Sequence, residues 1–265
     1  MNSLSRCLLL LALLCSHVGW GIGVWAGFDP DDLNFEGPSV NESALDTEVV
    51  KLIAEHRKAM LVGVSSEEVQ AIQLAGRYID ADGESRIVIQ KMRPAFLRVV
   101  LQSQRVSFTQ LFNGREGWNI VTKLGEAPQV IPMGIASSEA TRLSASIFNY
   151  LIESDQKGRI EYQMLSDDSS GNKGIEVTVN GVNVIHYWLD PDTFLIRREV
   201  KSDHNDAEFE FKTVLYDDYR VVDGLQIPYV IQHLGKNVVE YELHIDRVEV
   251  VDSFPESMFS PLGEY

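Results

Sequence analysis

The chain has 265 residues, of which 45% are hydrophobic, and this is enough for one sizeable domain or two small ones. Its 39 acidic and 23 basic residues give a formal net charge of −16 at pH 7. An acidic surface repels the phosphates of nucleic acids and of anionic lipids. The charge balance therefore argues against nucleic-acid binding and against broad electrostatic binding to membranes.

The N-terminal segment differs from the rest of the chain. Arg6 precedes an apolar run at 7–15 that is too short to span a bilayer, and Val-Trp-Ala at 24–26 precedes a possible cleavage site. We therefore predict a secretory signal peptide at 1–26 and export to the periplasm. The alternative is an uncleaved signal that tethers the protein to a membrane. Both cysteines lie in this segment, so the exported form has no disulfide.

The next residues predict a linker followed by a helix. Residues 27–42 mix Gly, Pro, Asp and Asn, which is typical of an extended linker. Apolar residues then recur at helical spacing over 43–60, and Glu48 falls in the first turn of this amphipathic helix. His56 lies on its apolar side, and we interpret it as a core-edge histidine rather than a metal ligand.

From residue 69 the apolar period drops to two, which predicts strands. A hairpin is expected over 69–92 with its turn at 81–83, followed by strands at 96–102 and 106–112. Asn113-Gly114 then favours a turn, because both residues tolerate positive φ. A phosphate-binding loop would instead open a helix and carry a lysine at a fixed offset, and the chain continues as a strand at Trp118.

Residues 124–137 contain two prolines and two glycines, so we predict irregular structure there. A second helix is expected to start at 138–140. Its apolar stripe would be Leu143, Ile147, Tyr150 and Leu151. This part of the chain is a candidate lid between two strand-rich stretches.

The second strand-rich stretch predicts an antiparallel meander, because short turns separate its strands. Strands are expected at 159–165, 175–180, 184–190, 194–201, 207–219, 227–234 and 239–250. In 208–215, one row holds Phe209, Phe211, Thr213 and Leu215, and the other row is charged. We interpret the first row as the dry face of a curved sheet that the two helices cover.

No catalytic or metal-binding pattern stands out in the sequence. The five histidines after residue 26 have neither HxH nor HExxH spacing, and no GxSxG motif is present. The sequence therefore predicts no catalytic residue, no metal site and no cofactor. An enzyme whose site assembles from distant residues stays open as an alternative.

Four motifs in order suggest a family. They are KMRPAFLR at 91–98, FNGREGW at 112–118, LDPDT at 189–193 and YRVVDGLQIP at 219–228. Together they resemble the bacterial outer-membrane lipoprotein carrier (LolA-like) superfamily. The chain is more acidic and longer in its second half than a typical carrier, and so looks closer to the uncharacterised relatives of that family.

The resemblance implies one α+β domain over 43–265, in which a half-open antiparallel β-barrel wraps around two helices. Its apolar interior would bind acyl chains, with cavity-facing side chains at Leu97, Val99, Leu101, Phe108, Phe112 and Trp118. An arginine beside a proline holds the cap in that family, and Arg93 matches it.

The implied function is a periplasmic, non-enzymatic carrier. Its partners would be lipoprotein acyl chains or phospholipid, together with transient membrane-associated donor and acceptor proteins. The alternative is an envelope sensor or regulatory lipid-binding module on the same fold. A cluster of polar groups with shifted pKa values inside the cavity would favour an enzyme instead.

Overall fold

The computed structural model describes residues 47–153, 159–181, 183–202, 211–235 and 238–261. The predicted signal peptide (1–26) and linker (27–42) lie outside these residues, as do residues 43–46 of the predicted domain. The helical elements are α2 (Thr47–Met60), η3 (Ser66–Glu68), α3 (Ile135–Ser144) and η4 (Glu256–Phe259). The strands before α3 are β1 (Ala71–Asp80), β2 (Gly83–Met92), β3 (Phe96–Gln102), β4 (Val106–Asn113), β5 (Gly117–Lys123) and β6 (Gln129–Pro132). The strands after it are β7 (Ile160–Leu165), β8 (Lys173–Val179), β9 (Asn183–Leu189), β10 (Ile196–Ser202), β11 (Phe211–Val222), β12 (Leu225–Gly235) and β13 (Val238–Val251).

The strands in the described part of the chain form one antiparallel sheet of 13 strands, in the order β6-β5-β4-β3-β2-β1-β13-β12-β11-β10-β9-β8-β7. Each half is a meander, and the pairing of β1 with β13 joins the halves at the centre. The strands β6 and β7 lie at the two ends of the sheet, and α3 follows β6 in the chain. The predicted antiparallel meander is therefore confirmed.

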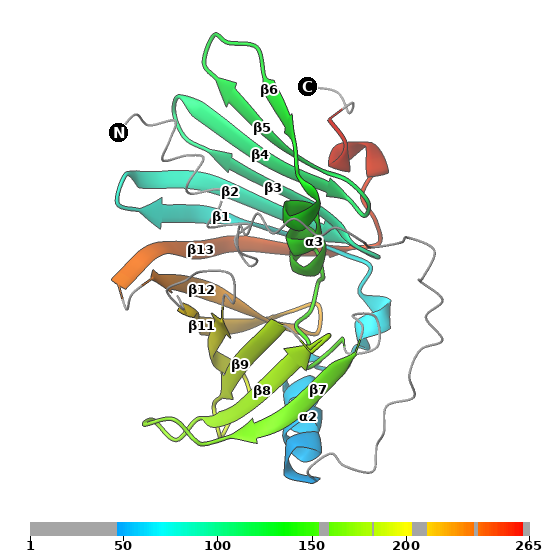
Figure 1. Cartoon of the computed structure of the whole chain (residues 1–265), viewed down its shortest axis with the longest axis vertical. Coiled ribbons are helices and arrows are strands. Elements are labelled where there is room, and N and C mark those ends of the chain that lie inside the picture. Colours follow the sequence, from blue (N-terminus) through cyan, green and yellow to red (C-terminus); the bar gives the residue numbers. More distant parts are fainter. Residues whose placement is uncertain (1–46, 154–158, 182, 203–210, 236–237, 262–265) are drawn as a thin grey trace, which may run out of the picture.

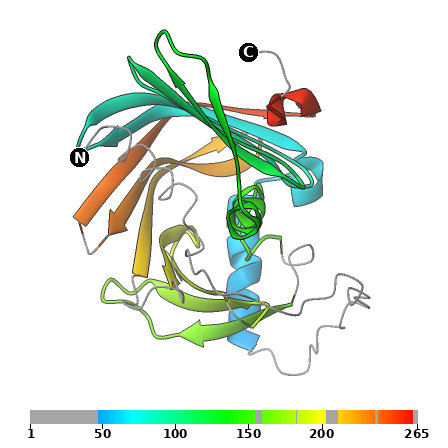
Figure 2. The same cartoon turned by 45° about the horizontal axis from the view of Figure 1, so that its top comes forward.

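The sheet curves strongly around the two helices (Figure 1). Figure 2 shows the β1–β6 half and the β7–β9 region facing each other, with α2 and α3 on the open side. Val49, Leu52 and Ile53 of α2 pack with inward side chains of β8 and β9. Ala145, at the end of α3, packs against β3 and β4. The predicted α+β fold, a curved sheet wrapped around two helices, is thus confirmed.

A β-bulge lies at the seam between the halves. The register of β1 against β13 shifts between Ala75 and Gly76. A Cβ built on Gly76 would lie 2.1 Å from the carbonyl oxygen of His244, so only glycine fits this close approach. Bulges bend strands and increase twist, and this one contributes to the curvature of the sheet.

The hairpin turns form where the sequence predicts them. Asp80 accepts hydrogen bonds from the backbone N–H groups of Asp82 and Gly83 through Oδ1, at 2.8 and 3.1 Å. Asn113 accepts from the N–H groups of Arg115 and Glu116 in the same way. Asn113-Gly114 is therefore a turn between β4 and β5, and no helix follows it.

The stretch between the two meanders differs from the prediction. Residues 129–132, expected to be irregular, form the short edge strand β6 on β5. The helix α3 begins at Ile135 and ends at Ser144, so Ile147, Tyr150 and Leu151 lie beyond it. Asn149 gives the reason, because its Oδ1 accepts the backbone N–H of Leu151 at 2.9 Å and forms a local turn that competes with a helix.

Candidate ligand-binding cavity

A cavity of about 390 Å³ lies between the concave face of the sheet and the residues after α3. We call α3 together with residues 145–153 the cap. Both halves of the sheet contribute to the lining, and so do Ile147, Phe148 and Tyr150 of the cap. Most of the lining is apolar, including Ile72, Leu74, Ile89, Leu97, Val99, Leu143, Ile185, Ile227, Ile231 and Leu243. A concave apolar space of this size is typical of small-molecule sites.

Two of the predicted cavity residues line this space. Leu97 and Val99 are two positions apart on β3, so both side chains point to the same face of the sheet. Their exposed fractions are 3% and 7%. Cross-strand pairing places Phe112 opposite Leu97 and Gln110 opposite Val99.

Three other predicted residues share that face without lining the cavity. Leu101 pairs with Phe108 across β3 and β4, and both pack in a small cluster with Val121. Phe112 is 1% exposed and packs in a separate cluster with Ala145 of the cap. These side chains support the wall behind the cavity, and a direct role in ligand binding stays a prediction.

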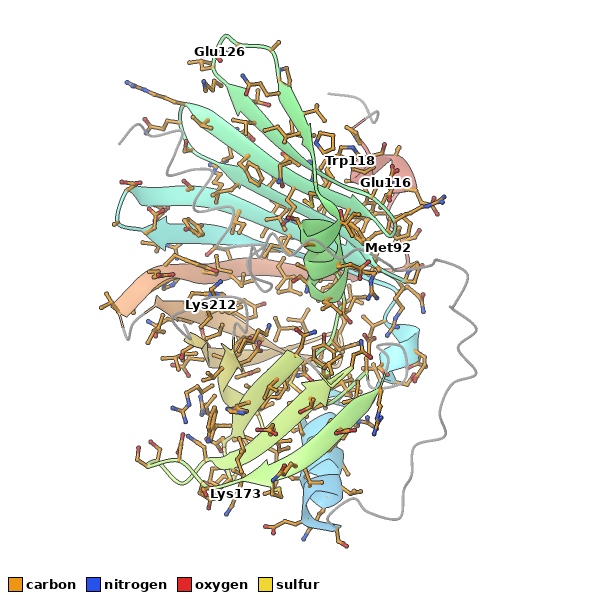
Figure 3. The ribbon with its side chains drawn as sticks, viewed as in Figure 1. Met92, Glu116, Trp118, Glu126, Lys173 and Lys212 are labelled. Atoms are coloured by element: carbon orange, nitrogen blue, oxygen red, sulfur yellow. The ribbon has the colours of Figure 1, made fainter. Side chains whose placement is uncertain are left out.

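Trp118 points the other way. It pairs with Leu111, and Leu111 pairs with Arg98, whereas the cavity residues of β3 are Leu97 and Val99. Because alternate residues of a strand face opposite sides, Trp118 lies on the convex face of β5 (Figure 3). Its predicted role in ligand binding has no support from this placement.

Arg93 connects the cap to the rest of the chain. Its guanidinium donates to the carbonyl oxygens of Val69, at 2.9 Å, and Ser66, at 3.0 Å, and forms an ion pair with Glu153. Glu153 also accepts a hydrogen bond from Oγ of Ser146 at 2.7 Å. Arg93 thus lies where the cap-holding prediction requires it, although the role itself stays a prediction.

Further polar contacts hold residues 145–153. Lys91 Nζ donates to the carbonyl oxygen of Ser146 at 2.8 Å, and Arg57 Nε donates to that of Leu151 at 2.7 Å. The hydroxyl of Tyr162 donates to the carbonyl oxygen of Tyr150 at 2.9 Å. Strand β2, helix α2 and strand β7 therefore each contribute one bond to the cap.

His56 adds a second contact between α2 and the cap. It is fully buried, and burial lowers its pKa to about 4, so the imidazole is neutral at pH 7. Its Nδ1 lies 2.7 Å from the carbonyl oxygen of Phe194, which can only accept, so we assign the proton to Nδ1. Nε2 then accepts from Nδ2 of Asn149 at 3.2 Å.

A cluster of polar side chains that the sequence analysis missed also lines the cavity. Lys91, Glu199, Lys201, Tyr216 and His233 come from β2, β10, β11 and β12. Lys201 Nζ lies 2.5 Å from Oε1 of Glu199, and the hydroxyl of Tyr216 donates to Oε2 of Glu199 at 2.8 Å. The only signal in the sequence was the pair of opposite charges two positions apart in β10, a spacing that places them on one face.

The prediction of which residues of β11 face the interior is wrong. Val214 and Tyr216 line the cavity, so the alternate residues Thr213 and Leu215 face outward. Phe209 lies outside the described residues. Alternation divides a strand into two rows, but only the pairing with β10 and β12 decides which row faces the cavity.

Burial shifts the pKa values of this cluster. Burial first, and then the positive charge of Lys201, lowers the pKa of Lys91 to about 8 and that of His233 to about 4. Burial alone would raise the pKa of Glu199. The charge of Lys201 and hydrogen bonds from Lys201 and Tyr216 outweigh it, so the pKa of Glu199 is below its usual value. At pH 7 Glu199 is ionised and His233 is neutral.

No group of three or more histidine, cysteine, aspartate or glutamate side chains within the described ranges is arranged to hold a metal ion. Over the same ranges, no helix has the length and apolar character needed to cross a membrane.

Sequence comparison finds no matching family model and no matching curated protein. Solved structures do match. A LolA superfamily protein from Nitrosomonas europaea superposes with a TM-score of 0.50 and 14% identity, over 80% of this chain and 97% of the other. A DUF1329 family protein from Desulfovibrio piger gives a TM-score of 0.53 and 10% identity, over 80% and 97%. A putative outer membrane lipoprotein-sorting protein domain from Vibrio parahaemolyticus gives 0.49 and 11%, over 80% and 96%.

The chain has the LolA-like fold. The match to the Nitrosomonas protein covers 97% of that structure and 80% of this chain. The resemblance drawn from the four motifs is thus confirmed for the fold. With 14% identity, the LolA-like match carries the architecture and leaves the ligand to be argued from the cavity itself.

Proposed function

We propose that this protein is a carrier that binds the acyl chains of lipoproteins or lipids in its cavity. The observation that carries the proposal is the apolar cavity of about 390 Å³ enclosed by the LolA-like sheet and its cap. Buried apolar surface provides about 25 cal/mol per Å², so an acyl chain removed from water there is bound without specific polar contacts.

The contacts of the cap support a carrier that opens and closes. The cap is held by hydrogen bonds from Lys91, Arg57 and Tyr162 and by the ion pair of Arg93 with Glu153. Apart from the peptide chain that runs from β6 into α3, these contacts are non-covalent. A hydrogen bond contributes about 0.5–1.5 kcal/mol when both groups are neutral and about 1.5–3 kcal/mol when one is charged. A donor or acceptor protein could therefore shift the cap by competing for a few bonds.

We further propose that the carrier works in the periplasm and exchanges its cargo with transient membrane-associated proteins. The predicted signal peptide supports export. The net charge of −16 supports a protein that neither coats anionic membranes nor binds nucleic acid.

Lipid extraction tests the carrier proposal. The full chain is expressed in a bacterial host, and the exported protein is extracted with organic solvent for mass spectrometry. We expect stoichiometric acylated peptide or phospholipid. Val99→Asp should abolish the signal, because it places a charge in the cavity wall.

Val100→Asp is the matched control, because Val100 neighbours Val99 on β3 but faces the convex side. It should retain bound lipid. Thermal unfolding of both variants establishes that each is folded. A folded wild-type protein without lipid, and unable to take up acyl chains when they are supplied, contradicts the proposal.

A dispersed catalytic site is the second candidate, and the polar cluster in the cavity favours it. Lys91 has a lowered pKa of about 8, a property of lysines that act as nucleophiles. The carrier remains the better candidate, because Glu199 is already engaged by Lys201 and Tyr216 rather than by Lys91. Reductive trapping of a carbonyl probe on Lys91, lost in Lys91→Met, would support the catalytic candidate.

A further inference from the structure

The charges inside the cavity do not balance. The charged residues of its lining are Lys91, Lys201 and Glu199, and His233 is neutral because its pKa is about 4. Two positive charges and one negative charge leave one excess positive charge at pH 7. A buried charge without a counter-charge is costly, so this arrangement favours an anion from a ligand.

The excess positive charge of the cavity has the opposite sign to the net charge of the whole chain. The chain as a whole carries 39 acidic and 23 basic residues. A random interior sample of such a chain would be acidic or neutral. The positive interior is therefore a local feature of the cavity and not a consequence of overall composition.

The ammonium group of Lys91 has more N–H donors than it uses in hydrogen bonds. Its ammonium group makes one hydrogen bond, to the carbonyl oxygen of Ser146, and the described residues provide no second acceptor for it. An ammonium group has three N–H donors. Lys201 of β10 lines the same cavity as Lys91 of β2, and its charge contributes to the lowered pKa of Lys91. The two lysines thus face one region of the cavity from opposite halves of the sheet.

The remaining residues of the cavity lining indicate that the ligand has two chemically different ends. Leu97, Val99 and Ile89 line the cavity beside Lys91 on β2 and β3, and the cap adds Ile147 and Phe148. A ligand with one charged end and one apolar end matches this division. The volume of about 390 Å³ is near the lower end of the range of roughly 300–1,000 Å³ for ligand sites, which favours a single chain.

We propose that the cavity binds a single-chain amphiphile with a singly charged anionic headgroup, a carboxylate or a phosphodiester, held by the ammonium groups of Lys91 and Lys201. This inference rests on the proposed function, because it assigns the headgroup to the same acyl-binding cavity. Glu199 holds Lys201 in place and neutralises one of the two positive charges. One positive charge then remains to pair with a singly charged headgroup.

Competition binding against an uncharged fluorescent acyl reporter tests the proposal on the full, delipidated protein. The ligands are hexadecanoate, an acyl lysophosphatidylglycerol and hexadecanol, all below their micelle concentrations. We expect at least one anion to bind about tenfold or more tightly than hexadecanol. Tight binding of hexadecanoate alone identifies a carboxylate, and tight binding of the lysolipid alone identifies a phosphodiester.

The readout for variants is the ratio of the two dissociation constants, that of hexadecanol over that of the preferred anion. Lys91→Met should reduce this ratio by about tenfold. Glu199→Gln should keep or increase it, since it removes the negative charge. The matched control is Lys58→Met, which changes an exposed lysine of α2 and should leave the ratio unaltered. Lys91→Met also removes the bond between Lys91 and Ser146 of the cap. Because both ligands use the same cap, this loss changes both dissociation constants by the same factor and leaves their ratio unaffected.

Equal binding of hexadecanol and both anions by the wild-type protein overturns the headgroup assignment while the acyl carrier stands. A Lys91→Met ratio equal to that of the wild type also overturns it. Absence of binding by all three ligands overturns the carrier proposal itself.

Discussion

Nδ2 of Asn149 donates a hydrogen bond to Nε2 of His56 at 3.2 Å, although 93 residues separate them in sequence. The same imidazole donates to the carbonyl oxygen of Phe194. One neutral side chain on α2 thus joins the cap to the loop before β10. This arrangement works only while Nε2 carries no proton, so the cap contact depends on pH.

Acid should weaken the folded state through His56. Its pKa is about 4 when folded and about 6.5 when unfolded, so the unfolded chain binds more protons between these values. Stability is full above pH 6.5 and falls as the pH decreases toward 4, by about 3 kcal/mol for this group. Urea unfolding at pH 7.5 and pH 4 measures the change.

His56→Gln is the informative variant, because glutamine retains a donor and an acceptor without titrating. It should show a smaller loss of stability between pH 7.5 and 4 than the wild type. His233→Gln should reduce the acid-induced loss of stability by a similar amount, since the pKa of His233 is also about 4. Identical pH profiles for His56→Gln and the wild type would refute this role.

The ion pair of Arg93 with Glu153 should be strongly coupled. The two side chains are 16% and 8% exposed. Removing one partner of a buried pair costs roughly 3–5 kcal/mol, because it leaves the other charge uncompensated. We expect Arg93→Met to destabilise the protein more when Glu153 is present than in a Glu153→Gln background.

A double-mutant cycle measured by urea unfolding gives this coupling directly. Hydrogen exchange of residues 145–153 should increase in Arg93→Met, which links the pair to the cap. Stability changes that add within about 0.5 kcal/mol would show that the pair does not couple.

The glycine at the seam should be irreplaceable. In Gly76→Ala the new methyl group would meet the carbonyl oxygen of His244 at 2.1 Å. Overpacking of this kind costs about 1–3 kcal/mol, and backbone is the obstacle here. Calorimetry should record a lower Tm for this variant.

Gly134→Ala provides the comparison. No atom lies within 4 Å of a Cβ at Gly134, and its φ of −71° suits any residue. As a change at the N-cap of α3, it should alter stability by less than about 1 kcal/mol. Equal Tm values for the two variants would contradict the close packing at the seam.

Anion binding should depend on pH through Lys91. Its pKa of about 8 means that the ammonium group loses its proton as the pH rises through this value. Besides burial, the groups that act on it are Lys201, Glu153 and Glu199, and Glu199 is already ionised at pH 7. We expect hexadecanoate affinity to be constant from pH 6.5 to 7.5 and to decline above 8 by at most about tenfold per pH unit.

Hexadecanol affinity should stay level over the same range, and Lys91→Met should remove the alkaline decline for hexadecanoate. The full ligand titration is repeated at each pH with both proteins. A decline that persists in Lys91→Met would assign the titration to another group.

Much of the local structure was predictable from the sequence. Strand β3 begins and ends at the expected residues, and the turns at Asp80 and Asn113 form as expected. Such turns depend on φ preferences and on side-chain bonds to backbone groups within three residues, which sequence carries explicitly. The second helix was predicted less well, because Asn149 bonds locally and His56 and Lys91, both distant in sequence, hold the residues after it.

The sequence by itself determined that the chain alternates between strands and turns, in an order that makes two antiparallel meanders with a helix before each. Tertiary structure alone decided which row of each strand faces inward. Period-two alternation divides the residues of a strand between two faces. It does not determine which face turns inward when both faces carry a mixture of polar and apolar residues, as in β10 and β11. Pairing and curvature turn Glu199 and Lys201 into the cavity and Trp118 away from it. The charge of the cavity is therefore a property of the folded sheet, because it depends on strands that are distant in sequence and meet only after closure.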